Sequence, residues 1–234
     1  MENLPLKPER AIVYIDGFNL YFGLRAGTVK HEKQKRIPKK SYWLDVQKLS
    51  ERIVKHNELV AVKYFTARIK GNQTKQHRQN TFLNAIQLHC SKLQMFEGNY
   101  LLRKMFCGKC RKFSSNIVCP FCKNVNIFPE EKKSDVNIAT QMLKDAYENN
   151  FDIAYLVSGD SDLVPPIQII RTMSSPKKVG IAFPPNRGGS KELNAVADFT
   201  FQISSTILKN YLLPDVILKP DGSELRIPSK WNVQ

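Results

Sequence analysis

The sequence lacks the features that would assign it to several common protein classes. It contains no apolar run near the roughly 20 residues that a membrane-spanning helix needs, and its first ten residues, MENLPLKPER, have no apolar signal segment. It also contains no internal repeat. At 234 residues, the chain is long enough for one main domain with at most a small attachment. We therefore expect a soluble, cytoplasmic protein that does not bind membranes.

Acidic residues are scarce relative to basic ones. The chain has 21 Asp and Glu against 36 Lys and Arg, which gives a formal net charge of +15. Basic proteins of this kind bind polyanions, because neutralising phosphate groups releases the counterions around them. Net charge indicates a class of partner and not a reaction, so a nucleic-acid partner and a merely basic soluble protein both remain open at this point.

Cysteine is almost confined to one segment. Four of the five cysteines are Cys107, Cys110, Cys119 and Cys122, which form two CxxC motifs with eight residues between them, and Cys90 stands alone. Four thiolates suit a tetrahedral Zn²⁺ ion in a closed structural site. Inside the cell, metal binding is favoured over disulfide bonds. The segment resembles a zinc ribbon, and we expect structural Zn²⁺ there.

Short apolar runs alternate with amphipathic segments along the rest of the chain. Strands are predicted at residues 11–15, 59–69, 93–96, 153–157, 177–183 and 199–203, and helices at residues 41–57, 72–93, 134–150 and 191–197. This alternation predicts an α/β fold with a parallel sheet flanked by helices.

Two of the predicted helices have an apolar stripe that should face the core. In residues 134–150 the stripe is Val136, Ala139, Leu143 and Ala146, with Ser134 or Asp135 as the N-cap. In residues 72–93 it is Phe82, Leu83, Ile86 and Leu88.

The cysteine segment divides the chain. We expect residues 10–99 and 129–210 to form the two parts of one domain, and residues 100–128 to be a zinc-ribbon insertion. Residues 211–234 should be a tail with a hairpin around Pro220, Asp221 and Gly222.

Aspartates follow two of the predicted strands. Asp16 comes after residues 11–15, and Asp160 and Asp162 come after residues 153–157. Ligands of parallel sheets bind beyond the carboxyl ends of the strands, so these carboxylates meet if the two strands are neighbours. Gathered carboxylates repel one another unless a cation is present, and Mg²⁺ and Mn²⁺ prefer oxygen ligands. The alternative is that Asp160, Asp162 or Asp135 only caps a turn or helix.

Three segments together resemble the NYN domain family, a branch of the PIN-like nucleases. They are IDGFNLY (residues 15–21), KKSDVNIA (residues 132–139) and LVSGDSDLVPPI (residues 156–167). The resemblance implies a Rossmann-like PIN fold and hydrolysis of RNA phosphodiester bonds at a carboxylate-bound Mg²⁺ or Mn²⁺ ion. By position it implies metal-binding and catalytic roles for Asp16, Asp135, Asp160 and Asp162. It implies that Asn19 holds a water or a phosphate oxygen through its amide, and that Ser158 positions the loop or a water.

One position departs from the family pattern. Many members have a further acidic residue about two turns after the position of Asp135, where this chain has Gln141. Asp145, one turn later, should point in another direction. This departure supports an alternative, a catalytically weak or inactive RNA-binding module of the same fold. A nuclease acting on DNA is a further alternative.

Basic residues surround the predicted site in the sequence. The candidates for contacts with nucleic acid are Lys132, Lys133, Arg187, Lys191, Arg111 and Lys112. The loop of residues 186–191 precedes a predicted helix, whose N-terminus could bind an anion, or it is simply a glycine-containing turn. Aromatic residues in the ribbon could stack on bases, although Phe106 and Phe121 fit better in the ribbon's own core. The expected partner is RNA, single-stranded or structured, and a homodimer is an open expectation without an identified interface.

Overall fold

A six-stranded parallel sheet forms the centre of the computed structural model, which describes residues 7–26, 37–101, 105–107, 109–114, 118–124 and 130–232. In spatial order the strands are β10 (Phe199–Gln202), β9 (Lys178–Phe183), β8 (Ile153–Val157), β1 (Arg10–Asp16), β2 (Glu58–Thr66) and β3 (Leu93–Glu97). Each neighbouring pair is parallel. The predicted α/β class is therefore confirmed, and β1 and β8 are neighbours.

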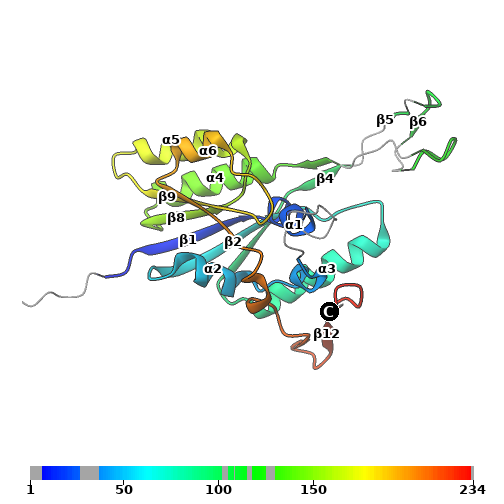
Figure 1. Ribbon diagram of the computed structural model, residues 1–234, viewed down its shortest axis with the longest axis horizontal. Helices are drawn as coiled ribbons and strands as arrows, with labels where there is room; N and C mark the ends of the chain where they lie inside the picture. Colours follow the sequence, from blue (N-terminus) through cyan, green and yellow to red (C-terminus); the bar gives the residue numbers. More distant parts are fainter. Residues whose placement is uncertain are drawn as a thin grey trace, which may run out of the picture.

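Helices cover both faces of this sheet (Figure 1). One face carries α4 (Ser134–Tyr147), α5 (Val164–Thr172) and α6 (Lys191–Val196), and the other carries α1 (Gly17–Ala26), α2 (Val46–Val54) and α3 (Gln73–His89). Side chains of β1 alternate between the two cores: Ile12 and Tyr14 pack in one, Val13 and Ile15 in the other. Burial on both faces explains why the strand is an unbroken apolar run.

Helix α1 starts directly after Asp16 and is absent from the predicted helices. Its first residue lies against β2. A Cβ atom at Gly17 would be 2.7 Å from the carbonyl oxygen of Phe65 and 2.7 Å from the Tyr64 ring. Only glycine allows this close approach. The side chains of the first helical turn, including Asn19, are consequently held beside the end of β1.

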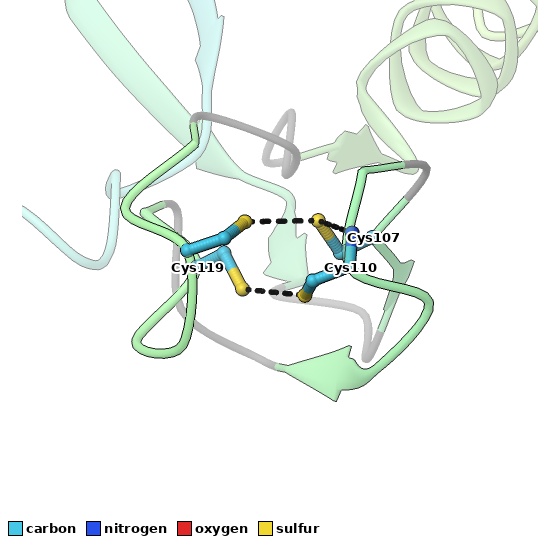
Figure 2. Close-up of side chains that lie close together, drawn as sticks. Cys107, Cys110 and Cys119 are labelled. Carbon is cyan, nitrogen blue, oxygen red and sulfur yellow. Dashed lines mark hydrogen bonds between the residues drawn. The ribbon is translucent and has the colours of Figure 1, made fainter.

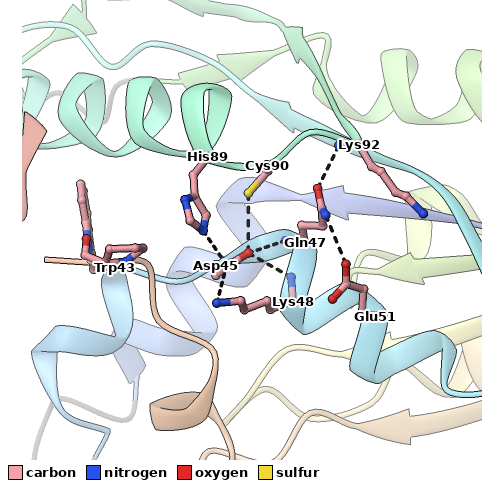
Figure 3. Close-up of polar contacts among 9 residues, drawn as sticks. Trp43, Asp45, Gln47, Lys48, Glu51, His89, Cys90 and Lys92 are labelled. Atoms are coloured by element: carbon pink, nitrogen blue, oxygen red, sulfur yellow. Dashed lines mark hydrogen bonds and ion pairs between the residues drawn. The ribbon is translucent and has the colours of Figure 1, made fainter. Parts of the chain in front are cut away.

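Helix α2 is shorter than the predicted helix at residues 41–57. A 3-10 turn, η1 (Lys39–Tyr42), comes first, and α2 begins only after Asp45. The Asp45 carboxylate accepts the backbone N–H groups of Gln47 at 3.1 Å and Lys48 at 2.9 Å, as an N-cap does (Figure 3). The cap thus sets the start of the helix.

The same carboxylate ties the end of α3 to α2. The Cys90 thiol lies 3.6 Å from Asp45 Oδ1, and His89 Nε2 lies 3.4 Å from Asp45 Oδ2 (Figure 3). Burial, followed by the charge of Asp45, raises the pKa of the Cys90 thiol to about 12. Cys90 is therefore a protonated core residue and a poor nucleophile.

Two predicted inward positions were wrong. Val136 is 66% exposed, because Ile138 and Met142 form the buried face of α4 together with Ala146, the one residue of the predicted stripe that is fully buried. A buried charged residue, Asp145, lies on that face and disguises the stripe in the sequence. Leu88, near the end of α3, is 42% exposed. The N-cap of α4 was also misplaced: the helix begins at Ser134, after Lys133 in a left-handed conformation.

Two small two-stranded sheets and a tail complete the fold. β4 (Asn99–Leu101) pairs with β7 (Glu130–Lys132), and β5 (Met105–Phe106) pairs with β6 (Phe113–Ser114), both antiparallel. β5 and β6 project away from the sheet, beyond β4 (Figure 1). The predicted tail hairpin is present as β11 (Val216–Leu218) and β12 (Glu224–Arg226), with Gly222 in its turn at a φ of +80°.

The tail also contributes to the core. Trp231, Ile217 and Ile227 belong to the hydrophobic cluster below the sheet. The remaining short turns are η2 (Ser161–Leu163) and η3 (Leu208–Asn210). Residues 30–40 are rich in Lys and Arg, and the part of this stretch before Ile37 lies outside the described residues. Of the helices that the structure describes, none has the length and apolar character to cross a membrane.

Candidate functional site

Asp16 lies at the end of β1, beside the end of β8. Its carboxylate is buried, and hydrogen bonds fix both oxygens: Asn19 N–H donates to Oδ1 at 2.9 Å, and Asn19 Nδ2 donates to Oδ2 at 2.7 Å. Ser158 Oγ, from the loop after β8, donates to Oδ2 at 3.0 Å. Burial raises the pKa of Asp16, whereas these hydrogen bonds lower it. Two segments distant in sequence thus hold one carboxylate in place.

Ser158 also organises the loop that contains Asp160 and Asp162. Its Oγ accepts the backbone N–H of Asp160 at 3.1 Å, and Asp160 Oδ1 accepts the N–H of Asp162 at 3.0 Å. Asp160 therefore caps η2, which was the alternative explanation for an aspartate here. Its other oxygen takes no part in the cap. Asp162 is exposed.

Asp135 lies in the first turn of α4 and is half-buried. Within the described part of the chain, no side chain caps this helix, so Asp135 does not act as the cap that the alternative explanation required. Burial raises its pKa to about 6, with further contributions from the charges of Asp16, Asp160 and Asp162. The four aspartates are therefore close enough to act on one another electrostatically.

The four carboxylates nevertheless do not converge on one point. Among the described residues, only the four cysteines form a group of three or more possible metal ligands whose atoms all lie within 4.8 Å of one another. The aspartates are more widely spaced than the ligand atoms of a single bare ion would be.

The side chain of Asn19 tests independently whether a cation fits this site. Its Nδ2 donates to Asp16, which leaves Oδ1 as an acceptor. This Oδ1 atom is buried and has no hydrogen-bond partner among the described residues. It faces the loop after β8, because a Cβ atom built on Gly159 would lie 3.7 Å from it. A buried acceptor beside carboxylates fits a hard cation or its water, and all the possible ligands are oxygens, as Mg²⁺ and Mn²⁺ prefer.

Gln141 and Asp145 belong to a separate buried network on α4. The ammonium group of Lys63, on β2, lies 2.7 Å from Asp145 Oδ2 and donates to Gln141 Oε1 at 3.3 Å. Tyr14 also donates to Asp145, at 2.6 Å. Asp145 thus has its own counter-ion, and Gln141 contacts that counter-ion through its amide oxygen. The prediction that Asp145 points elsewhere agrees with these contacts.

The predicted basic contacts fall into four places. Arg187 is exposed in the loop after β9, and it lines a shallow hollow together with Gly159, next to the carboxylate loop. Lys132 and Lys133 immediately precede α4, where Asp135 lies. Arg111 and Lys112 lie between β5 and β6 in the sequence, and these two strands project away from the sheet (Figure 1). Lys191 is exposed at the start of α6, a helix of only six residues.

The four cysteines form a compact cluster (Figure 2). Cys107 Sγ and Cys122 Sγ are 3.5 Å apart, as are Cys110 Sγ and Cys119 Sγ. Zn–S bonds of about 2.3 Å in a tetrahedron place sulfur atoms about 3.8 Å apart, so the cluster fits a zinc ion closely. The four thiols could therefore hold one structural zinc.

The two CxxC motifs have the same backbone turn. In the first, Arg111 N–H donates to Cys107 O at 2.8 Å and Arg111 has a φ of 55°. In the second, Lys123 N–H donates to Cys119 O at 2.8 Å and Lys123 has a φ of 58°.

Backbone N–H groups of these turns favour the thiolate form of one cysteine in each motif. They lower the pKa of Cys107 to about 6, chiefly through the N–H of Cys110, and they lower the pKa of Cys119, chiefly through that of Cys122. Burial raises the pKa of Cys110 to about 12, so its proton must leave when a metal binds.

Phe121, which we expected in a small ribbon core, is 56% exposed. The ammonium group of Lys112 lies 4.5 Å from the centre of its ring. The expectation was therefore wrong for Phe121, and the side chain of Phe106 is outside what the structure describes.

Two features were missed in the sequence, although each has a visible signal. Lys63 is a single charged residue within an otherwise apolar strand, a pattern that indicates a buried ion pair. Phe18, Tyr21 and Phe22 recur at helical spacing after Asp16, which would have indicated an aromatic face on α1.

Comparisons with known proteins agree with the fold. The family model of the NYN domain matches residues 10–206. The chain is 29% identical over 256 residues to a 6-hydroxy-3-succinoylpyridine 3-monooxygenase of Pseudomonas putida, covering 97% of this chain and 77% of that protein. A solved structure of a Vibrio parahaemolyticus protein of unknown function is similar, with a TM-score of 0.52 and 20% identity, over 90% of this chain and 99% of that one.

Proposed function

Because the chain belongs to the NYN domain family of PIN-like nucleases, we propose that it is a metal-dependent endoribonuclease. One observation carries the proposal: four aspartates lie where β1 and β8 end and α4 begins, and burial together with the charges of the other three disfavours ionisation of Asp135. A divalent cation would relieve that repulsion. The buried, unpartnered Oδ1 of Asn19 supports a cation at the same place.

The carboxylates of Asp16, Asp135, Asp160 and Asp162 would hold Mg²⁺ or Mn²⁺. When bound, the ion supplies positive charge against the negative charge that builds on the phosphate oxygens during hydrolysis. Ser158 and Asn19 orient the Asp16 carboxylate by donating to it, so this ligand is in place before substrate arrives. The proton of the attacking water needs an acceptor, and the exposed carboxylate of Asp162 can take it.

The substrate follows from the charge and the chemistry of the surroundings. A net charge of +15 favours a polyanion as the substrate. Arg187 lines a hollow together with Gly159 of the carboxylate loop, and Lys132 and Lys133 directly precede the helix that contains Asp135. These groups could hold the phosphates that flank the cut bond. RNA as the polymer rests on the family relationship. A structural zinc in the cysteine cluster would stabilise the segment that contains Arg111 and Lys112. These two residues would then offer the RNA a further contact surface.

Cleavage assays test this proposal directly. Zinc-loaded protein, dialysed free of other divalent ions, would be incubated with labelled single-stranded RNA and with DNA of the same sequence, with and without Mn²⁺. The metal-free control omits Mn²⁺ and adds no chelator, because a chelator would also remove zinc from the cysteine site. We expect RNA cleavage only with Mn²⁺, and a loss of at least about 100-fold in Asp160→Asn, which removes a metal ligand.

Asp152→Asn is the matched control. Asp152 precedes β8 at the opposite end of the strand and forms an exposed ion pair with Arg10, so the same substitution there should leave cleavage unchanged. Cleavage without Mn²⁺, or in Asp160→Asn at the wild-type rate, would refute the carboxylate mechanism. Binding without cleavage would establish the inactive RNA-binding module, and equal cutting of DNA would refute the RNA preference.

A second candidate function comes from the Pseudomonas putida protein, which is named a monooxygenase of a substituted pyridine. The observation that favours it is a pocket of about 190 Å³, lined by aromatic and basic side chains, against α1. A monooxygenase would consume O₂ and a two-electron reductant while it hydroxylates the ring. Oxygen uptake with 6-hydroxy-3-succinoylpyridine and a reduced nicotinamide would support this candidate, and its absence would eliminate that reaction.

A further inference from the structure

The aromatic pocket lies against α1, the helix that begins directly after Asp16. Parts of α1, α3 and the C-terminal tail form its walls, and these elements lie together below the sheet in Figure 1. Eight aromatic side chains line it, among them Phe18, Tyr21, Phe22, Tyr42, Phe82 and Trp231. Its volume of about 190 Å³ exceeds the roughly 150 Å³ in which an apolar cavity binds benzene. The pocket can therefore accept one planar ring.

The aromatic walls are arranged around the pocket as a connected set. The ring centres of Tyr21 and Tyr42 are 5.5 Å apart, and those of Tyr42 and Trp231 are 5.6 Å apart. At the outer side, Tyr21 and Phe22 are 41% and 40% exposed. Neighbouring exposed aromatic rings beside a pocket are typical of a binding surface, since such rings stack on a flat ligand.

Cationic side chains line the same pocket. Arg25, on α1, and Lys75 and Arg78, on α3, all contribute to its walls. Lys75 and Arg25 are exposed, and Arg78 is half-buried. Apolar rings with cations beside them suit a planar ring attached to an anionic group. A nucleotide has this chemistry, because its base is planar and its phosphate is negatively charged.

A second, shallow hollow connects the pocket with the carboxylate site. Phe22 and Arg25 line both spaces, and the shallow hollow continues to Arg187 and Gly159. Gly159 lies between Ser158 and Asp160. The guanidinium carbon of Arg187 is 5.9 Å from the centre of the Phe22 ring, so a cation lies along this path. A polymer could occupy both places at once, which a single small aromatic molecule could not do.

We propose that the aromatic pocket holds one unpaired nucleobase of the RNA strand whose phosphate lies at the carboxylates. The inference rests on the proposed function for the identity of the polymer, and it adds a substrate preference. A base within a duplex is stacked and paired, so only a single-stranded region can place a base in the pocket. Arg25 and Arg187 would contact the phosphates between this base and the carboxylates.

Binding measurements without Mn²⁺ test the pocket independently of cleavage. Zinc-loaded protein would be titrated into a short fluorescent single-stranded RNA, the same RNA in a duplex, and the same RNA with single abasic positions. We expect single strands to bind more tightly than duplex, and one abasic position to weaken binding more than the others. Loss of one stacked base should weaken binding by about 5- to 50-fold.

Protein variants provide the second arm. Tyr21→Ala and Phe22→Ala remove exposed rings of the pocket and should weaken single-strand binding by about 5- to 50-fold each. Tyr147→Ala is the matched control, because Tyr147 is an 86% exposed aromatic residue at the far end of α4 and does not line the pocket. Wild-type binding by both pocket variants would overturn the inference.

Photo-crosslinking distinguishes the pocket from other RNA contacts. An RNA with 4-thiouridine at the position found by the abasic scan should crosslink to α1 or to Trp231. Crosslinks confined to the cysteine segment would overturn the inference. If the protein cuts RNA but the pocket variants bind normally, only the inference fails; if they bind weakly but the protein does not cut, only the proposed reaction fails.

A small-molecule arm distinguishes the other source of the same chemistry. Tryptophan fluorescence, to which the pocket residue Trp231 contributes alongside the buried Trp43, would be followed during titration with uridine monophosphate, adenosine monophosphate and 6-hydroxy-3-succinoylpyridine. Quenching by the nucleotides, reduced in Tyr21→Ala, supports the base pocket. If only 6-hydroxy-3-succinoylpyridine quenches the fluorescence and single-stranded RNA does not displace it, the base-pocket inference is overturned and the pocket is a small-molecule site.

Discussion

The cysteine cluster and the carboxylate site are two candidate metal sites that are assembled in opposite ways. The cysteines come from two similar turns close together in sequence, and their sulfur atoms lie 3.5 Å apart in pairs. The aspartates come from β1, α4 and the loop after β8, with Asp16 more than a hundred residues before the other three, and they do not form so close a group. The first site is local, and the second depends on the sheet.

Charge also differs between the two sites. In the cysteine segment, backbone N–H groups lower the pKa of Cys107 and Cys119 and so stabilise their thiolates. At the carboxylate site, burial and the charges of the other three aspartates raise the pKa of Asp135. Asp145 is a useful third case, because it is a buried carboxylate with the permanent counter-ion Lys63 at 2.7 Å. The charge of Asp145 is thus already neutralised by Lys63, whereas the group of four aspartates would need a cation for the same purpose.

The largest expected effect concerns the local site. Cys119→Ser removes one of four ligands and should lower the zinc content from about one ion per chain to none. The segment should then unfold locally, because structural zinc contributes about 10–16 kcal/mol to the folding of such segments. Hydrogen exchange should show loss of protection in β5 and β6, while the sheet keeps its protection. Metal analysis and exchange mass spectrometry measure both results. Cys90→Ala should keep its zinc, and a zinc-containing Cys119→Ser protein would contradict the assignment.

An intermediate effect is expected for the neutralised carboxylate. Asp145→Asn leaves the buried Lys63 without its partner and should lower the free energy of unfolding by about 3–5 kcal/mol in urea titrations. Asp152→Asn, which removes the exposed partner of Arg10, should lower it by less than about 1 kcal/mol. Equal effects of the two substitutions would show that burial does not distinguish these ion pairs.

The smallest effect should have the opposite sign. Folding raises the pKa of Asp135 to about 6, so ionisation of this carboxyl opposes folding. Its contribution to stability is present below about pH 4 and is lost as the pH rises through about 6. Without Mg²⁺ or Mn²⁺, Asp135→Asn should therefore be more stable than the wild type at pH 7.5, by about 1 kcal/mol after allowance for solvent screening of a half-exposed group.

The same variant distinguishes a repulsive group from a metal site. At pH 4 the stability gain of Asp135→Asn should disappear, and added Mn²⁺ at pH 7.5 should stabilise the wild type more than the variant. Urea unfolding with zinc-loaded protein measures all of these conditions. If Asp135→Asn is less stable than the wild type without Mn²⁺, repulsion among the aspartates does not favour a cation.

Much of the fold follows from local patterns in the sequence. Continuous apolar runs identified the strands of the sheet, since strands buried on both faces have no polar alternation. The helices were harder to delimit. Asp45 looked like a residue inside a helix but caps α2, and buried Asp145 disguised the inward face of α4. In both cases, a charged residue has a tertiary partner that sequence spacing does not reveal.

The sequence by itself determined the α/β class and the cysteine cluster, because both depend on residues close together along the chain. Only the tertiary structure decided that β8 lies beside β1, that Ser158 donates to Asp16, and that Lys63 neutralises Asp145. It alone brought the tail against α1 and α3 to form an aromatic pocket. Strand order and long-range packing fix these contacts, and apolar or charged patterns within one segment contain no record of the segment that will lie beside it.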